Sequence, residues 1–240
     1  MRPRVLVTRP EPGASATARR LEEVGFSPVV MPLSETLALP VDVSAIPHDM
    51  DAVAVTSANA IRHASDDLIA SLAGRRLFAV GRKTAKAARE AGFASVIEGS
   101  GDAVGLADQI LAELPAGSRI LYLTGRVRLD HFERRIAESG LRVFVKETYD
   151  TRRIDYPEEA VASLLAGGQI DAVLLYSAKA AEALSGLAGQ PGMHSLFATA
   201  RYFCLSDRVA ASLNAAEKDR ISIAAEPTED ALLSLLKADR

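Results

Sequence analysis

Small polar and cationic residues recur where apolar runs of this 240-residue chain end, and these residue types suit the binding of an anion. The short apolar runs are typical of buried strands, and helix-like stretches lie between them. In a parallel α/β sheet, ligands bind outside the carboxyl ends of the strands, where helix N-termini present backbone N–H groups. The residues at these ends are Thr8-Arg9, Thr56-Ser57, Gly81 to Thr84, Thr124 to Arg126, Ser177 and Ser206. A single serine or threonine of this kind is typical of a helix N-cap, but clustering in two matching sets favours an anion-binding cleft.

Cations near helix N-termini serve anion binding rather than helix stability, and those beside these strand ends support the same interpretation. They are Arg9, Arg82, Lys83 and Arg126. No G-x-S-x-G, P-loop or G-x-G-x-x-G motif occurs, and no close pair of carboxylates suggests acid–base catalysis. The four histidines lack metal-ligand spacing, so we expect no metal site. These features indicate a binding protein, or an enzyme whose reactive substrate needs mainly a shaped site.

Short apolar runs alternate with longer amphipathic ones, which predicts an α/β fold with parallel sheets flanked by helices. The ten predicted strands, enough for two five-stranded sheets, are Val5–Thr8, Pro28–Met31, Ala52–Thr56, Leu77–Val80, Ser95–Ile97, Ile120–Leu123, Arg142–Lys146, Ala172–Tyr176, Tyr202–Leu205 and Ile221–Ala224. The predicted helices are Ser15–Val24, Ala58–Ala70, Thr84–Ala91, Asp102–Leu114, Leu129–Ser139, Pro157–Ala166, Ala178–Gly186, Asp207–Ala216 and Thr228–Ala238. Gly25, Gly92 and Gly140 fall just past helix ends, where a left-handed residue is favoured.

The chain also contains a repeat of domain size. The run Asp51 to Ala60 returns as Asp171 to Ala180, and the run Arg4 to Phe26 returns as Arg119 to Leu141. Two shorter matches occur in the same order, with an offset that increases slowly, as short loop insertions would cause. A unit of this length is too long for a solenoid repeat and indicates two similar domains.

Charge and composition restrict the partners and the compartment. The net charge is −3 and no run of five like charges occurs, so we expect no nucleic-acid or anionic-membrane surface. No apolar run approaches the ~20 residues of a membrane helix, and the N-terminus lacks a signal-peptide pattern. The single Cys204 permits no internal disulfide, which favours the cytoplasm.

Six motifs, taken in order, resemble the uroporphyrinogen-III synthase family over essentially the whole chain. They are Val5 to Pro10, Thr56 to Ala60, Ala79 to Ala85, Gly125-Arg126 with Leu129 ahead of Glu147-Thr148-Tyr149, Tyr176 to Ala178, and Glu226 to Thr228 with Ala231-Leu232. Each motif alone is weak, but six at compatible spacing are fairly specific.

The resemblance implies two similar α/β domains, each a five-stranded parallel sheet flanked by helices, joined by a two-stranded connector. The chain would start in domain one, cross to build domain two, and return. The implied bounds are 1–34 plus 152–240 for domain one, 41–146 for domain two, and 35–40 and 147–151 for the connectors. Pro32–Met50 and Lys146–Pro157, which break the alternation of strand and helix, contain these crossings.

The implied activity is that of a lyase (a hydro-lyase) in tetrapyrrole and heme biosynthesis. The family converts hydroxymethylbilane, a linear tetrapyrrole with eight carboxylates, into uroporphyrinogen III by removing water, closing the ring and inverting ring D. It uses no cofactor or metal. The unaided substrate closes to the type I isomer, so the enzyme's task is largely to hold a geometry. We expect hydroxymethylbilane as the small-molecule partner of a monomer, with no nucleic-acid or membrane partner.

In the family the substrate lies in a cleft and is held mostly by backbone amides. Tyr149 matches a tyrosine suspected of helping the hydroxyl leave, as a proton donor or through a hydrogen bond, so it is the expected catalytic residue. Its alternative role is interdomain packing. The expected substrate-binding residues are Arg9, Thr56, Ser57, Gly81, Lys83, Thr84, Gly125, Arg126, Ser177, Ser206 and Arg208. At Ser206 the chain departs from the glycine that many members have, and we expect Asp207 to cap a helix while Arg208 makes the contact.

A non-enzymatic two-domain protein that binds a sugar or an amino acid is the main alternative, because that class also has twin α/β domains and crossing connectors. Tight binding without turnover would favour it. A tandem receiver-like signalling protein fits less well, since Thr8-Arg9 and Ser57 stand where receiver domains need acidic residues.

Overall fold

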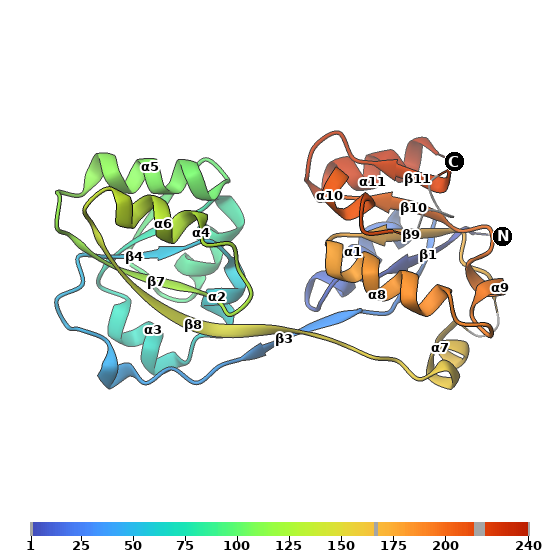
Figure 1. Ribbon diagram of the computed structural model, residues 1–240, viewed down its shortest axis with the longest axis horizontal. Coiled ribbons are helices and arrows are strands. Elements are labelled where there is room, and N and C mark those ends of the chain that lie inside the picture. Colours follow the sequence, from blue (N-terminus) through green and yellow to red (C-terminus); the bar gives the residue numbers. More distant parts are fainter. Residues whose placement is uncertain (1, 166–167, 214–218, 240) are drawn as a thin grey trace. The chain divides into compact units, whose positions relative to one another are not determined.

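The computed structural model describes residues 2–165, 168–213 and 219–239 (Figure 1). The chain divides into two compact units, one made of Met1–Glu35 with Arg152–Arg240 and the other of Thr36–Thr151. Each unit is an α/β layer structure built around its own sheet.

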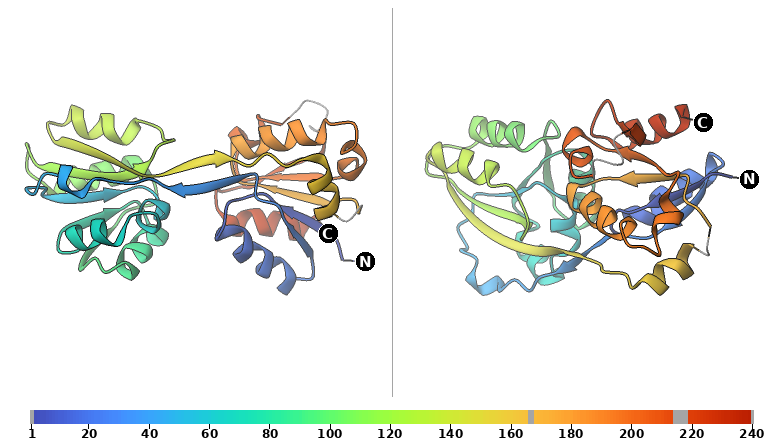
Figure 2. Two further views of the ribbon diagram at one scale, coloured as in Figure 1. Left: turned by 90° about the horizontal axis from the view of Figure 1, so that it is seen from below. Right: turned by 45° about the vertical axis from the view of Figure 1, so that its right-hand side comes forward.

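The first unit holds a five-stranded parallel sheet in the order β11-β10-β9-β1-β2. Its strands are β1 (Arg4–Val7), β2 (Ser27–Val30), β9 (Ala172–Leu175), β10 (Arg201–Cys204) and β11 (Ile221–Ile223). Its helices are α1 (Gly13–Glu23), α7 (Glu158–Leu165), α8 (Ala178–Ala188), α9 (His194–Phe197), α10 (Asp207–Ala210) and α11 (Glu229–Ala238). The central strands are apolar on both faces because helices cover both: α1 and α11 pack on one face, and α7 to α10 on the other (Figure 2).

The second unit holds a six-stranded sheet in the order β3-β8-β7-β4-β5-β6. Its strands are β3 (Ser34–Ala38), β4 (Ala52–Val55), β5 (Arg76–Ala79), β6 (Ser95–Glu98), β7 (Arg119–Gly125) and β8 (Arg142–Arg153). Its helices are the 3₁₀ turn η1 (Val43–Ala45), α2 (Ala58–Arg62), α3 (Asp66–Leu72), α4 (Arg82–Glu90), α5 (Ala103–Glu113) and α6 (His131–Glu138). Helices α2, α3 and α4 cover one face, while α5 and α6 cover the other.

The internal repeat predicted from the sequence is present at the level of strand register. The repeat relates each of five strands of the second sheet to one strand of the first: β4 to β9, β5 to β10, β6 to β11, β7 to β1 and β8 to β2. With these pairs matched, the two sheets have the same strand order, and β3 is an additional strand beside β8. Ile120 of β7 pairs with Ala52 of β4, and at the matching positions Val5 of β1 pairs with Ala172 of β9. The prediction of a two-sheet α/β fold with similar halves is confirmed.

A polar contact is repeated with the register. The backbone N–H of Arg119 donates to Asp51 Oδ2 at 2.8 Å, and the N–H of Arg4 donates to Asp171 Oδ2 at 2.7 Å. In return, the N–H of each aspartate donates to the carbonyl of that arginine, at 2.9 and 3.0 Å. Each aspartate therefore fixes the amino ends of the two central strands of its sheet.

Most of the residues expected to form the two-stranded connector lie in two longer strands. β3 adds a sixth strand beside β8, and β8 continues through the predicted connector 147–151 to Arg153. Both passages of the chain between the units fall inside these two strands. Extended polar segments adopt this structure because their backbone N–H and C=O groups find partners in each other, as from Leu39 N to Thr148 O at 2.8 Å.

The helix predicted over Ala58–Ala70 is wrong in one respect, because two helices occupy the range. Helix α2 ends at Arg62, and Ser65 starts α3 by accepting a hydrogen bond from Leu68 N at 3.3 Å. A serine followed by two acidic residues is a strong start signal that interrupts an otherwise continuous apolar pattern. Helix α9 was not predicted, and α10 ends at Ala210, while residues 214–216 of its predicted range lie outside the described residues.

Replacing either of the repeated aspartates should destabilise the protein by a similar amount. We expect Asp51→Ala and Asp171→Ala each to lower the free energy of unfolding by about 1 kcal/mol, since each removes the acceptor of one backbone N–H. Asp→Asn at the same positions keeps an acceptor and serves as the control. Urea titrations followed by circular dichroism measure the effect. A large loss at one site and none at its counterpart would contradict the structural equivalence.

Candidate functional site

Each sheet has a switch point where successive connections leave in opposite directions, between β4 and β7 in the second unit and between β9 and β1 in the first. Ligands of open α/β sheets bind outside the carboxyl ends of the strands at such points. The sequence-predicted residues lie at these edges. Those in the second unit are Thr56, Ser57, Gly81, Lys83, Thr84, Gly125, Arg126 and Tyr149, and those in the first are Arg9, Ser177, Ser206 and Arg208.

The two predicted serines occupy equivalent positions and have the same local role. Ser57 follows β4 and caps α2, with Oγ accepting from Asn59 N at 3.2 Å. Ser177 follows β9 and caps α8, with Oγ accepting from Ala180 N at 3.2 Å. A hydroxyl that accepts from the backbone retains its own hydrogen for donation. Each serine can therefore cap its helix and also donate to an anionic ligand.

Helix α4 begins directly after the predicted residue Gly81. Its N-cap is Gly81, which provides no side-chain cap, and the first intrahelical bond runs from Ala85 N to Gly81 O. The preceding N–H groups, around exposed Lys83 and buried Thr84, have no intrahelical acceptor, as at any helix start. A side chain at Gly81 would place its Cβ 3.2 Å from Gly101 Cα, so the close approach of this loop favours glycine.

The equivalent turn of the first unit lies between β10 and α10. Its N-cap is Ser206, which makes no side-chain capping bond, and Asp207 is the first residue of the helix. The expectation that Asp207 itself is the cap is therefore wrong, because the extended backbone conformation falls at Ser206. Arg208 is exposed, as a residue that contacts a ligand has to be.

Tyr149 sits at an irregular point of the sheet. Thr124 of β7 pairs with Glu147, but the next residue, Gly125, pairs with Tyr149, so Thr148 is the extra residue of a bulge. The tyrosine ring lies against Gly125, where a Cβ would come within 2.6 Å of Tyr149 Cζ. Among the described residues the Tyr149 hydroxyl makes no hydrogen bond to another side chain or to the backbone. It is therefore available to a ligand.

Charged residues surround this tyrosine. Arg126 pairs with Glu147 at 3.2 Å and with Asp150 at 3.4 Å, and Arg128 pairs with Glu147 at 2.9 Å and Glu133 at 2.5 Å. The hydrogen bond from Arg128 holds the pKa of Glu147 below its usual value. The Arg126 side chain is 53% exposed, so it can exchange these partners for another carboxylate at small cost. A pocket of about 310 Å³ opens beside Arg126 and Glu147.

A buried hydrogen bond joins the two central strands behind this edge. Thr56 Oγ1 lies 2.6 Å from the hydroxyl of Tyr122, whose side chain is buried. Burial raises the pKa of Tyr122, so the group is neutral and serves as a hydrogen-bonding partner. Thr56 is thus held by the core, and its predicted contact with substrate would have to come from its backbone or from its hydroxyl hydrogen, which is free when the Tyr122 hydroxyl is the donor.

In the first unit the switch point is occupied by an ion-pair network. The Arg9 guanidinium lies 4.5 Å from the Tyr176 ring centroid and pairs with Glu229 at 3.1 Å. Arg20 also pairs with Glu229, at 3.2 Å. Burial raises the pKa of Tyr176, and within the described part of the chain its hydroxyl has no hydrogen-bond partner. Arg9 is therefore engaged in the absence of a ligand.

Sequence reasoning missed Arg128 and two of the carboxylates that form ion pairs at these edges. Arg128, Glu133 and Glu229 belong to no motif, and Glu229 is far from Arg9 along the chain. The one available signal for Glu229 was its place directly after Thr228, a residue that begins a helix. Which cation it pairs with depends on the sheet order.

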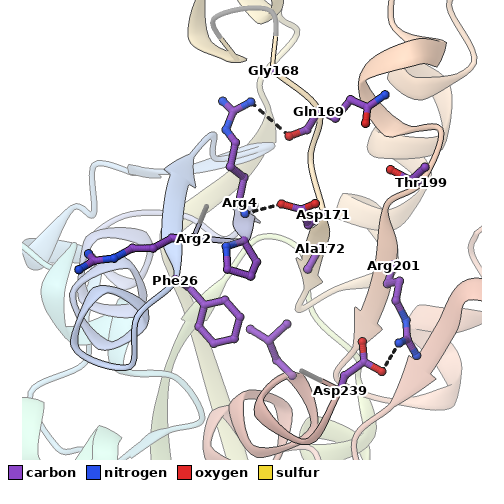
Figure 3. Close-up of a pocket in the computed structure, with 12 residues that line it drawn as sticks. Arg2, Arg4, Phe26, Gly168, Gln169, Asp171, Ala172, Thr199, Arg201 and Asp239 are labelled. Carbon is purple, nitrogen blue, oxygen red and sulfur yellow. Dashed lines mark hydrogen bonds and ion pairs between the residues drawn. The ribbon is translucent and has the colours of Figure 1, made fainter.

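A larger pocket lies elsewhere, at the amino edge of the first sheet, with a volume of about 650 Å³ (Figure 3). Two of its cations are used within the unit: the Arg4 guanidinium donates to Leu165 O at 2.6 Å and Gln169 O at 3.2 Å, and Arg201 pairs with Asp239. The pocket also contains none of the sequence-predicted residues. We place the candidate site at the carboxyl edges, where unengaged N–H groups and the Tyr149 hydroxyl are found.

Across residues 2–165, 168–213 and 219–239, no cluster of three histidine, cysteine or acidic side chains is arranged to hold a metal ion. In the same part of the chain, no helix has the length and apolar character needed to cross a membrane.

Comparison with known proteins identifies the family. The family model described as "Uroporphyrinogen-III synthase HemD" matches residues 15–234. A similar solved structure is a uroporphyrinogen-III synthetase from Helicobacter pylori (18% identity, all of both chains covered, TM-score 0.68). Another is a mutant uroporphyrinogen III synthase from Thermus thermophilus (23% identity, 99% of this chain and 97% of that one, TM-score 0.56). No curated protein matches the chain. The structural likenesses support the fold, and the family model shows that this chain belongs to the uroporphyrinogen-III synthase family of lyases.

Proposed function

We propose that this chain converts hydroxymethylbilane into uroporphyrinogen III, with loss of water, ring closure and inversion of ring D. The observation that carries the proposal is the family match over residues 15–234. The carboxyl edges support it, since they offer unengaged N–H groups and exchangeable cations to a substrate with many carboxylates. A binding protein without turnover is not favoured, because the family consists of enzymes.

Backbone N–H groups at helix starts would hold the substrate carboxylates. In the second unit the donors are the first turn of α4, behind Gly81, and the hydroxyl of Ser57. In the first unit they are the first turn of α8, behind Ser177, and the turn at Ser206 with Arg208. Helix starts favour anions because unpaired N–H groups and the helix dipole act together. The remaining binding residues would be Lys83, Thr84, Thr56 and Gly125.

The two cations Arg126 and Arg9 would bind substrate carboxylates by exchange. Arg126 would release Asp150 or Glu147, and Arg9 would release Glu229. The exchange replaces one carboxylate with another, so the total number of ion pairs is unchanged. Because Arg126 is the more exposed, we expect it to exchange more readily than Arg9.

Tyr149 would act on the departing hydroxyl of the substrate. Its hydroxyl donates a hydrogen bond, or a proton, to the oxygen that leaves, and the released species is water. The bond that breaks joins this oxygen to the terminal carbon of hydroxymethylbilane, which is left as an electron-poor centre. Ring D attacks that centre through the carbon already linked to ring C, which forms a spiro intermediate. The older bond then breaks and re-forms at the free carbon of ring D, and the proton lost there balances the one taken up by the departing water. The rest of the site supplies orientation, which by itself contributes a large part of such a rate enhancement.

The proposal extends to organisation and place in the cell. Domain one would correspond to residues 1–34 plus 152–240 and domain two to 41–146, each with its own carboxyl edge. The chain would act as a monomer in the cytoplasm, without cofactor, metal or nucleic acid. The small net charge of −3 supports the absence of a nucleic-acid partner. The single cysteine suits a reducing compartment.

A coupled assay tests the reaction. Hydroxymethylbilane is generated in place by a deaminase from porphobilinogen, the protein is added, and the oxidised uroporphyrin isomers are separated. We expect isomer III to predominate, because the protein closes the ring before spontaneous closure gives isomer I. Isomer I alone from a protein shown to be folded by circular dichroism would rule the proposal out.

Tyr149→Phe and Ser57→Ala should separate chemistry from binding. We expect Tyr149→Phe to lower kcat by at least about tenfold, because it removes the group that assists the leaving hydroxyl. Ser57→Ala should change kcat/KM by no more than about threefold, while costing about 1 kcal/mol of stability through the lost helix cap. The same isomer assay, run at several substrate concentrations, gives both constants. Equal and negligible effects of the two changes would discredit the role given to Tyr149.

A further inference from the structure

The position of the Tyr149 ring depends on contacts that no motif contains. The bulge at Thr148 turns the following side chain out of the regular alternation of β8. Thr148 is itself fully buried, and its hydroxyl donates to Ala60 O at 2.8 Å. The backbone beside the tyrosine is thus tied to helix α2 on one side, and to β7 through Arg126 N and Tyr149 O at 2.8 Å on the other.

Gly125 supplies one contact of the ring. A Cβ at this position would lie 2.6 Å from Tyr149 Cζ and 2.9 Å from the hydroxyl oxygen, which is closer than nonbonded atoms approach. The glycine therefore leaves room for the ring, which rests directly on the backbone of β7, and a side chain here would push the end of the ring aside.

His63 supplies the second contact. Its ring is stacked on the Tyr149 ring, with 5.8 Å between centroids and 27° between planes. The histidine is held by its own partners, since Nε2 lies 2.8 Å from Thr36 Oγ1 and its backbone N–H donates to Asn59 O at 3.0 Å. Desolvation, and then the charge of Arg62, lowers the pKa of His63, so the ring is neutral at pH 7. Tyr149 is stacked by a fixed, uncharged ring.

Helix α2 connects this contact to the predicted binding edge. The helix begins after its cap Ser57, at the carboxyl end of β4, and ends at its cap residue His63. A helix of five residues leaves little freedom between its two ends. Binding of an anion at Ser57 and placement of Tyr149 therefore depend on the same short element.

We propose that His63 is a positioning residue, which together with Gly125 holds the Tyr149 hydroxyl where it meets the leaving group of the substrate. The inference rests on the proposed function and goes beyond it in assigning a role to a residue outside the family motifs. His63 acts through Tyr149 and touches no reacting atom, and Thr36 in turn fixes the orientation of His63.

The test is a double-mutant cycle between positions 63 and 149. We expect His63→Ala to lower kcat about tenfold with KM changed less than twofold, since a displaced catalytic group costs rate rather than binding. In the Tyr149→Phe background the same change should have almost no effect, because there is no hydroxyl left to position. His63→Phe keeps a stacking ring and should restore most of the rate. His48→Ala, at an exposed histidine of the same unit, is the matched control and should be silent.

An NMR titration of the histidine rings gives a readout that does not depend on activity. His63 should titrate below the ordinary value of about 6.5, and Tyr149→Ala should bring it back toward that value by admitting water. Gly125→Ala should do the same by displacing the ring.

The possible outcomes separate the two claims. A wild-type protein that yields only isomer I overturns the proposed function. An active wild type in which His63→Ala costs nothing, or costs the same in both Tyr149 backgrounds, overturns the positioning role alone. Unchanged His63 titration in Tyr149→Ala and Gly125→Ala overturns the stacked arrangement itself.

Discussion

The pairing of two fully buried parallel strands in each unit, β4 with β7 and β9 with β1, is the constraint on which the rest of the structure depends. These strands are apolar on both faces, so helices have to cover both sides of each sheet. The other strands lie on both sides of this pair, so the chain connections on one side run in the opposite direction to those on the other side. The reversal leaves helix starts and strand ends converging at one edge, and that edge is where a ligand can be bound.

The two copies of this arrangement have come to differ in what fills the edge. In the first unit Arg9, Glu229 and Arg20 occupy the switch point with their own charges, next to the ring of Tyr176. In the second unit Gly125 leaves room for the ring of Tyr149. The repeat therefore accounts for the scaffold, and the proposed chemistry depends on where the two copies differ.

The sequence predicted the scaffold well because short runs such as Ala52–Val55 and Ala172–Leu175 have no polar face. It predicted the carboxyl edges as the candidate site because ligands of α/β sheets bind outside the carboxyl ends of the strands, and those ends can be located from the sequence. The apolar pattern ended the predicted strand at Lys146 because the residues that follow are polar, and only the family resemblance implied a connector strand there. Pairing with β7 and β3 extends β8 to Arg153. The sequence did not predict the contact of Tyr149 with Gly125 and His63, because a one-residue bulge decides which side chain faces β7. Such contacts depend on how the residues of β7 and β8 pair, and the local pattern of apolar and polar residues carries no information on that pairing.

The central claim is that carboxylates are bound by N–H groups at the carboxyl edges. The most direct test follows backbone amide shifts by NMR while uroporphyrinogen III is titrated into the protein under anaerobic conditions. The account predicts the largest changes at Ser57 to Asn59, at Arg82 to Thr84 and at Ala178 to Ala180, the first turns of α2, α4 and α8. Changes confined to the amino edge, around Arg4, Asp171 and Arg201, would contradict it and would move the site to the pocket on that side.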